Sequence, residues 1–227
     1  MVLNDAHVRY SAADYNHYTR AFVQPYDTMM IGWVLEQVAR LPPTFTLADI
    51  GTGTAQLLLQ LAPLPELAGC DFIGTDLFPD MIAEAENEVR AAGLEHRIRL
   101  LTDDIHASTL PDQSADLIIS RSTLHHWSDP AQGLREIYRI LRVGGRALIV
   151  DVRRDAPAEV IAEFNRQRAE AGITPSVTDE KFTVPEVEQF VRTAGLEGVA
   201  TVNAGQNGLA RLGLAVSMRK RAATPLA

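Results

Sequence analysis

Short hydrophobic runs alternate with helical patterns along the chain from about residue 44. The runs that indicate strands lie at 45–50, 71–76, 97–102, 115–120 and 146–152. Between them, apolar residues recur at helical spacing, most clearly over 55–62, 79–93 and 129–145. This alternation predicts an α/β protein with a mostly parallel sheet, helices on both faces and right-handed crossovers.

The segment 129–145 carries the helix signals on which its expected bounds rest. Asp129 is placed to cap its start, and the pair Gly144–Gly145 is typical of a helix end. We therefore expect one helix that runs up to these glycines, with the fifth strand beginning directly after them.

The alternation of strand and helix patterns changes after the fifth predicted strand. A helical pattern over 185–195 is followed by two strand-like segments, 196–205 and 208–220, with only a turn between them. Such a short connection is typical of a hairpin, so one of the two strands is expected to run antiparallel.

Two further segments lie outside the alternation, one before it and one within it. Residues 1–41 are expected to form one or two helices, and 153–183 contain a charged helix and a Pro-containing loop. Both could cover a ligand crevice. We interpret residues 1–227 as a single domain with four parts: a helical N-terminal cap (1–41), a binding core (42–152), an insertion on the substrate side (153–183), and a final helix and strand hairpin (184–227).

Composition and charge narrow the class of protein. The 227 residues are 46% hydrophobic and 22% charged, as in an ordinary globular protein, and no apolar run reaches the ~18 residues that span a bilayer. The N-terminus lacks the pattern of a signal peptide, and Cys70 alone can form neither an internal disulfide nor a multi-thiolate metal site. We expect a cytoplasmic protein without a membrane partner. The net charge of −8 gives no overall basic footprint for nucleic acid.

The stretch "LADIGTGTAQL" is the most informative part of the chain. Gly51 and Gly53 lie between a predicted strand and a predicted helix. Glycine there permits a positive φ and close approach of the backbone to a ligand, and the following helix offers free N–H groups. Because open parallel sheets bind ligands at the carboxyl ends of their strands, this turn predicts a binding site.

Acidic residues follow the next two strands at the same expected edge. Asp76 ends the second strand, 25 positions after Gly51, and Asp103, Asp104 and Ile105 follow the third. A carboxylate after the second strand can accept hydrogen bonds from both hydroxyls of a ribose. A carboxylate and a backbone N–H after the third can bind the adenine amino group and a ring nitrogen. Each aspartate alone could equally be a helix cap or a solvated loop residue.

A family resemblance rests on these residues and on two later blocks. The order "DIGTGTA", "GTDLFPDMI", "DDIHASTLPDQSADLIISRSTLHHWSDP" and "LREIYRILRVGGRALIVD" resembles the class I S-adenosylmethionine-dependent methyltransferases. The resemblance is close over 44–152 and loose beyond. It implies a Rossmann-like seven-stranded sheet of order 3-2-1-4-5-7-6 with the last strand antiparallel. It also implies the cofactor S-adenosylmethionine, with S-adenosylhomocysteine as product.

The resemblance also implies roles for individual residues of this chain. Those expected to bind the cofactor are Asp49, Gly51, Thr52 and Gly53 around the methionine part, Asp76 and Leu77 at the ribose, Asp103, Asp104 and Ile105 at the adenine, Ser120 and Arg121 near the sulfonium, and Tyr10 and Tyr18 in the N-terminal cap, a segment that closes over the cofactor in related enzymes. The family usually has a third glycine where this chain has Ala55, a departure that we expect to be tolerated.

A nicotinamide dehydrogenase is the alternative within the same architecture. Its Gly-x-Gly-x-x-Gly pattern would need a glycine at position 56, where this chain has Gln56. Asp76 would suit either cofactor. The glycine spacing and the later blocks favour S-adenosylmethionine.

The segment "SRSTLHHWSDP" (120–130) raises the question of a catalytic base. A metal site is disfavoured, because adjacent histidines usually point apart and no Cys/His cluster supplies further ligands. His125 and His126 could simply pack and hydrogen-bond within the loop. Alternatively one of them accepts a proton, with His126 preferred over His125, and Tyr18 is a third catalytic candidate. Arg153 and Arg154, just past the fifth strand, could face an anionic acceptor or lie in solvent.

The leading interpretation is a methyltransferase that acts on a small molecule, because the caps are short and no separate recognition domain is evident. The alternatives are a methyltransferase for a peptide or protein and a non-catalytic protein that binds S-adenosylmethionine. Nucleic acid is disfavoured as a partner, and a homodimer is possible. The sequence does not identify the acceptor atom.

Overall fold

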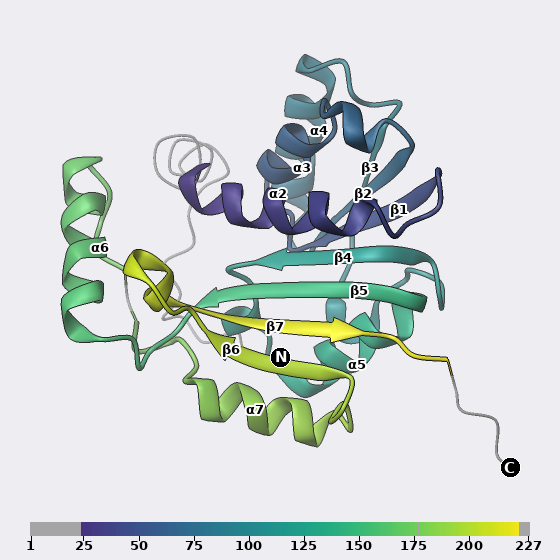
Figure 1. Ribbon diagram of the computed structural model, residues 1–227. Coiled ribbons are helices and arrows are strands. Elements are labelled where there is room, and N and C mark those ends of the chain that lie inside the picture. Colours follow the sequence, from purple (N-terminus) through teal and green to yellow (C-terminus); the bar gives the residue numbers. More distant parts are fainter. Residues whose placement is uncertain (1–23, 177, 223–227) are drawn as a thin grey trace, which may run out of the picture.

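The computed structural model describes residues 24–176 and 178–222 and places a seven-stranded sheet at the centre of the molecule (Figure 1). The strand order is β3-β2-β1-β4-β5-β7-β6, as the resemblance implied. The strands are β1 (Phe45–Ile50), β2 (Cys70–Asp76), β3 (Ile98–Thr102), β4 (Ala115–Arg121), β5 (Leu141–Val152), β6 (Ala200–Ala204) and β7 (Gly213–Arg219). β7 pairs antiparallel with both β5 and β6, and all other strand pairs in this sheet are parallel.

Helices cover the two faces of the sheet in separate groups (Figure 1). They are α2 (Gln24–Val38), α3 (Gln56–Leu61), α4 (Pro79–Ala91), α5 (Pro130–Ile140), α6 (Ala158–Glu170) and α7 (Val184–Thr193). Side chains of α2, α3 and α4 share one hydrophobic cluster with β1 and β2, whereas α5 and α7 pack into a second cluster on the opposite face. The chain is therefore a three-layer α/β/α structure.

The central strands have the composition that burial on both faces requires. Leu117, Ile118 and Ile119 of β4 are all fully buried, and they alternate between the two hydrophobic clusters. A near-continuous apolar run is the expected pattern of a parallel strand with helices on each side. This is why the strand positions could be predicted from hydrophobicity alone.

The predicted end of the helix over 129–145 is wrong. Helix α5 ends at Ile140, and β5 begins at Leu141 and runs through both glycines. Leu141 is buried and pairs with Ala115, after which the register between β4 and β5 shifts. Gly144 (φ 88°) allows this bulge and donates its N–H to the Lys220 carbonyl oxygen. The glycines thus shape a strand irregularity instead of a helix end.

The two segments outside the alternation have different surroundings. Helix α6, from the insertion at 153–183, lies beyond the end of β5 (Figure 1) and packs through Val160 and Phe164 into a small cluster of its own. Helix α2 lies within the N-terminal segment, and residues 1–23 are outside the described part. The predicted hairpin at the C-terminal end is confirmed, with a 3-10 turn over Gly208–Leu212 between its strands.

The described helices were also compared with the length of a bilayer span. None of them is both long and apolar enough to cross a membrane.

Two helical glycines give a matched test of packing. A Cβ at Gly133 in α5 would lie 2.6 Å from the buried Trp127 ring, whereas a Cβ at Gly32 in α2 would meet no atom within 4 Å. We expect Gly133→Ala to lower the free energy of unfolding by about 1–3 kcal/mol, because the ring must move. Gly32→Ala should raise it by about 0.5–1 kcal/mol. Urea denaturation checks both, and equal effects of the two substitutions would contradict the packing described.

Candidate active site

The carboxyl ends of the parallel strands meet at one edge of the sheet, and the glycine turn after β1 lies there. Gly51 and Gly53 both adopt a left-handed conformation, with φ of 72° and 56°. A Cβ at Gly51 would lie 2.3 Å from the Cγ2 atom of Thr123, in the loop after β4. The turn therefore requires glycine at this position for both backbone conformation and space.

Asp76 fixes the turn to the next strand. Its Oδ2 accepts the N–H of Gly53 at 2.9 Å, and its Oδ1 accepts the N–H of Phe78 at 3.0 Å. One carboxylate thus links the turn after β1 to the start of α4. A carboxylate has about four lone-pair sites, so Asp76 keeps acceptor capacity for further donors such as hydroxyl groups.

The residues next to Asp76 and after β3 provide apolar and polar surfaces. Leu77 is 42% exposed and follows Asp76 directly. Asp104 accepts hydrogen bonds from the backbone N–H and ring Nδ1 of His106, at 2.9 and 2.6 Å, and these bonds outweigh its partial burial and lower the pKa of its carboxyl. Ile105 is buried beside it.

Asp103 has contacts of a different kind. Its Oδ2 accepts from the Ser108 hydroxyl at 2.6 Å, and its Oδ1 accepts from the backbone and hydroxyl of Thr109, both at 2.8 Å. The side chain is also buried. These contacts favour a role in holding the loop after β3 over the predicted contact with a cofactor, for which Asp104 is better exposed.

Asp49, near the end of β1, contributes a buried carboxylate to the site. It is buried and accepts a hydrogen bond from the Thr52 hydroxyl at 2.8 Å. Burial raises the pKa of Asp49 to about 7, against the lowering effects of Thr52 and Arg121. A group that is partly protonated near neutral pH would release its proton when a cation binds close by.

Ser120 and Thr123 connect the ends of β1 and β4. Ser120 is fully buried, and its hydroxyl donates to the Ile50 carbonyl oxygen at 2.7 Å and hydrogen-bonds the Thr123 hydroxyl. The predicted place of Ser120 near a sulfonium is untested. Its observed contacts hold the two loops together.

Arg121 forms an ion pair that the sequence did not predict. Its Nε lies 2.9 Å from the Oδ1 of Asp27 in α2, and the Gln60 amide of α3 donates to the other oxygen of Asp27 at 2.8 Å. Asp27 is 1% exposed, and burial raises the pKa of its carboxyl although Arg121 and Gln60 oppose this. The pair fastens helix α2 to the carboxyl end of β4.

His125 is oriented by a buried carboxylate. Its Nδ1 lies 2.8 Å from the Oδ2 and 2.9 Å from the Oδ1 of Asp151, and its backbone N–H donates to Oδ2 at 3.0 Å. Burial favours a raised pKa for Asp151, but His125 and Lys181 outweigh it and lower that pKa. With Nδ1 engaged by the carboxylate, Nε2 is the ring nitrogen left for another partner.

His126 differs from His125 in exposure. It is exposed, and its ring lies 3.8 Å from the ring of His125 between centroids, at 46°. The geometry therefore gives the buried histidine the carboxylate partner of a general base, whereas the sequence preferred the exposed one. In the described ranges, no group of three or more His, Cys, Asp or Glu side chains is placed to hold a metal ion.

Two tyrosines and two arginines remain among the candidate residues from the sequence. Tyr10 and Tyr18 lie outside the described residues. Arg153 pairs with Asp155 at 2.9 Å, and Arg154 donates to both carboxylate oxygens of Glu186. These two arginines are thus held by the protein's own carboxylates instead of facing a ligand.

The residues at this edge fit an adenosine-containing cation. Asp76 is fixed by two backbone groups and can accept from hydroxyls, and the exposed Leu77 offers apolar surface beside it. Asp104 and the backbone after it follow on the neighbouring strand. Asp49 adds a carboxylate whose ionisation a nearby positive charge would favour.

Comparisons with known proteins agree with this geometry. Residues 48–149 match the sequence profile of a methyltransferase domain. This match identifies a methyltransferase domain within the chain. A demethylmenaquinone methyltransferase of Thermus thermophilus is 33% identical over 103 residues, which are 45% of each protein. A ubiquinone/menaquinone biosynthesis C-methyltransferase of Geotalea uraniireducens is 29% identical over 103 residues, 45% of this chain and 43% of that protein.

The match to solved structures extends further along the chain. A structure from Methanococcus maripaludis, described as an S-adenosylmethionine-dependent methyltransferase, covers 99% of this chain and 100% of its own, with a TM-score of 0.72 and 21% identity. This similarity shows the fold. The aligned region of this chain spans less than half the length of the curated relatives named above.

The structure adds residues at this candidate site that the sequence did not mark. Asp27 and Gln60 lie far from Arg121 in the sequence and have no motif of their own. Asp151 has a signal in hindsight, because it is the second-last residue of the fifth strand, much as Asp76 is the last of the second. Its partnership with His125 depends on β4 and β5 being neighbours, which the resemblance implied.

The pKa of Asp49 predicts a pH effect on stability. Native Asp49 keeps its proton up to about pH 7, whereas the unfolded chain releases it near ~4. Between these values the unfolded chain binds fewer protons, so this group lowers the free energy of unfolding as pH rises. Asp49→Asn should remove the decrease, which we expect to be on the order of 2 kcal/mol between pH 5 and 7.5.

Urea denaturation at both pH values measures this effect. The exposed Asp71→Asn on β2 is the control and should leave the pH dependence unchanged. Groups with lowered pKa, such as Asp151, titrate below this window and do not contribute to it. Equal pH dependence in the native protein and in Asp49→Asn would contradict the assignment.

Proposed function

We propose that this chain transfers a methyl group from S-adenosylmethionine to a small-molecule acceptor and releases S-adenosylhomocysteine. The observation that carries the proposal is the Asp76 carboxylate. It is fixed by the glycine turn and by the start of α4, at the sheet edge where His125 is held by Asp151. A binding site for the cofactor and a candidate base therefore lie along one edge of the sheet.

The binding residues would place the cofactor by its adenosine part. Asp76 would accept from the ribose hydroxyls, and Asp104 with the backbone N–H of Ile105 would bind the adenine. The cofactor supplies an activated methyl group on a sulfonium. Transfer is then an in-line displacement, so the main task of the protein is to hold the acceptor close and aligned.

His125 gives the site a means of removing a proton. Asp151 accepts from Nδ1–H and so fixes the tautomer in which Nε2 carries the lone pair. A proton from the acceptor would move to Nε2 while the acceptor atom forms its bond to the methyl carbon. This favours an acceptor that must lose a proton, such as a hydroxyl oxygen or the ring carbon of a phenol.

The relatives and the charge support a small acceptor. Two of the similar proteins are named as methyltransferases of quinone biosynthesis. The net charge of −8 disfavours a nucleic-acid substrate. A peptide acceptor and a binding protein without transfer activity are the alternatives that the experiments below separate.

Binding of S-adenosylmethionine tests the first part of the proposal. We expect titration calorimetry to detect binding, and Asp76→Asn to weaken it about 10-fold or more, because a charged acceptor is lost. Asp71→Asn, at an exposed position near the start of the same strand, should bind as the native protein does. Absence of binding to the native protein would refute both the enzyme and the binding-protein interpretations.

Substitution of the two histidines tests the base. Against a panel of phenols, quinols and peptides, product detection should identify a small acceptor. We then expect His125→Gln to lower kcat by about 10²–10⁴-fold and to abolish the acidic limb of the pH–rate profile. His126→Gln is the matched control and should keep both.

Two further measurements separate catalysis from folding. Affinity for S-adenosylmethionine and the free energy of unfolding are measured for each variant, and we expect His125→Gln to retain the affinity. Asp151→Asn should also lower kcat, because the imidazole loses its orienting carboxylate. Full activity in His125→Gln would exclude it as the base, and methylation of peptides alone would replace the small-molecule acceptor.

A further inference from the structure

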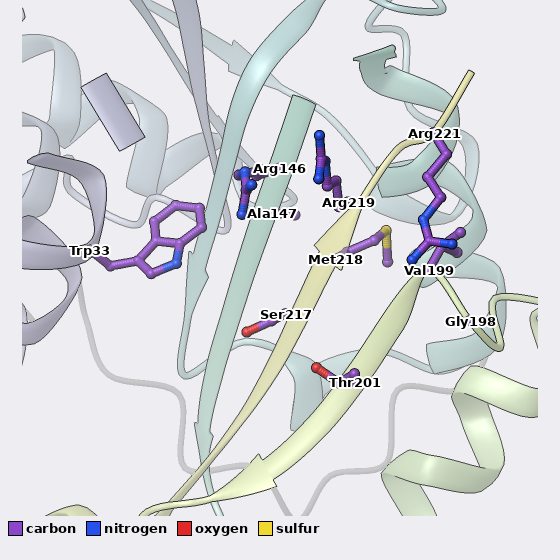
Figure 2. A pocket seen from close by; sticks show the side chains of 10 residues that line it. All are labelled: Trp33, Arg146, Ala147, Gly198, Val199, Thr201, Ser217, Met218, Arg219 and Arg221. Carbon is purple, nitrogen blue, oxygen red and sulfur yellow. The ribbon is translucent and has the colours of Figure 1, made fainter. Parts of the chain in front are cut away.

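A pocket lies away from the proposed active site, over the part of the sheet formed by β5, β7 and β6 (Figure 2). It has a volume of about 280 Å³. Its lining consists of Trp33 from α2, Arg146 and Ala147 from β5, Gly198, Val199 and Thr201 at β6, and Ser217, Met218, Arg219 and Arg221 at the end of β7. Such a volume suits a compact group rather than a large ligand.

The alternation of side chains along the strands explains why this pocket is polar. Ala147 and Met218 point into the cluster with α5 and α7, so their neighbours point to the opposite face. On that face Arg146 is paired directly with Arg219, and Ser217 is paired with Thr201. Two guanidinium groups and two hydroxyls therefore share one surface.

This surface is open in the described part of the molecule. In Figure 1, α5 and α7 lie behind β5, β7 and β6, and no described helix lies in front of them. Figure 2 shows Arg146 and Arg219 side by side, with Trp33 on one side, Arg221 on the other, and the two hydroxyls farther along the strands. The arrangement is a shallow cup with cations around it.

The arginines of this cup lack the carboxylates that other arginines of the chain have. Within residues 24–176 and 178–222, no carboxylate forms an ion pair with Arg146, Arg219 or Arg221. Elsewhere the pairs include Arg121–Asp27, Arg139–Asp112, Arg142–Asp116, Arg153–Asp155 and Arg154–Glu186. Burial and the nearby Arg219 and Arg40 lower the pKa of Arg146, so its closest charged neighbours are cations. In a chain of net charge −8, this concentration of unpaired arginine makes the pocket a candidate anion site.

We propose that this pocket binds the phosphate groups of a small ligand that carries two or more linked phosphates. Guanidinium groups match phosphate oxygens with two parallel hydrogen bonds each, and several arginines around one cup suit more than one phosphate. The hydroxyls of Ser217 and Thr201 add donors of the kind that phosphate accepts. The volume and the open side fit a di- or triphosphate group whose remainder extends into solvent.

The pocket is separate from the proposed methyl-transfer site. Arg146 and Asp151 are five residues apart on β5, which corresponds to about 16 Å along an extended strand. Arg146 lies at the middle of that strand, whereas Asp151 lies near its carboxyl end, where the proposed active site is. Binding here therefore does not depend on the proposed function and can be measured without methyl transfer.

Titration calorimetry of the full chain with inorganic tripolyphosphate, pyrophosphate and orthophosphate tests the proposal. We expect affinity to increase with the number of linked phosphates and to fall as salt is added. The double substitution Arg146→Gln and Arg219→Gln should weaken tripolyphosphate binding at least ~10-fold. The matched control is Arg90→Gln with Arg192→Gln on α4 and α7, which makes the same change in charge and should bind nearly as well as the native protein.

Further measurements place the ligand and its class. Arg221→Gln, at an exposed side chain, should also weaken binding and does not disturb the sheet. Saturating S-adenosylhomocysteine and the Asp76→Asn variant should leave tripolyphosphate binding unchanged. Competition with S-adenosylhomocysteine, an equal loss in the control pair, or binding only to a single-stranded oligonucleotide or a poly-glutamate peptide would each overturn the proposal.

Discussion

The site depends on one electrostatic constraint: charged side chains are concentrated at the carboxyl edge of the sheet, and each buried one needs partners. In spatial order, β3 is followed by Asp103, β2 ends in Asp76, β1 carries Asp49, β4 ends in Arg121, and β5 carries Asp151 near its end. Arg121 thus stands among these four carboxylates. The loops that form the site are held where they are because these groups recruit their N–H, hydroxyl and imidazole donors.

The partners of each carboxylate decide what it can do. Asp103 is buried and fully engaged by Ser108 and Thr109, so it shapes a loop. Asp76 accepts two backbone N–H groups and keeps capacity for a ligand. Asp49 has one hydroxyl partner, and burial raises its pKa, so its charge responds to a bound cation. Asp151 binds and orients the imidazole of His125. The same residue type thus serves four purposes, and its hydrogen-bond donors distinguish them.

Hydrophobic periodicity predicted the strands well because those of a doubly covered sheet are buried on both faces. It failed at the end of α5, where Leu141 already pairs with β4 and the following glycines form a bulge. A Gly-Gly pair is typical of both a helix end and a strand bulge, so the sequence did not distinguish them. The glycine turn and Asp76 were predictable because they are contiguous or regularly spaced. The Asp27–Arg121 pair was not, since it joins residues 94 positions apart. Ala55 has a left-handed φ of 62°, which explains why the family favours glycine there.

Acidic side chains and unpaired arginines gather at two different places on the sheet. Carboxylates dominate the edge at which a cationic cofactor would enter, and they would raise its local concentration. Arginines without a carboxylate partner in the described part of the chain gather around the middle of β5 and the end of β7, on the face away from α5 and α7. Because β7 runs antiparallel to β5, its last residue, Arg219, lies beside Arg146. The reversed final strand, a consequence of the hairpin, is therefore what assembles the basic pocket at a distance from the proposed methyl-transfer site.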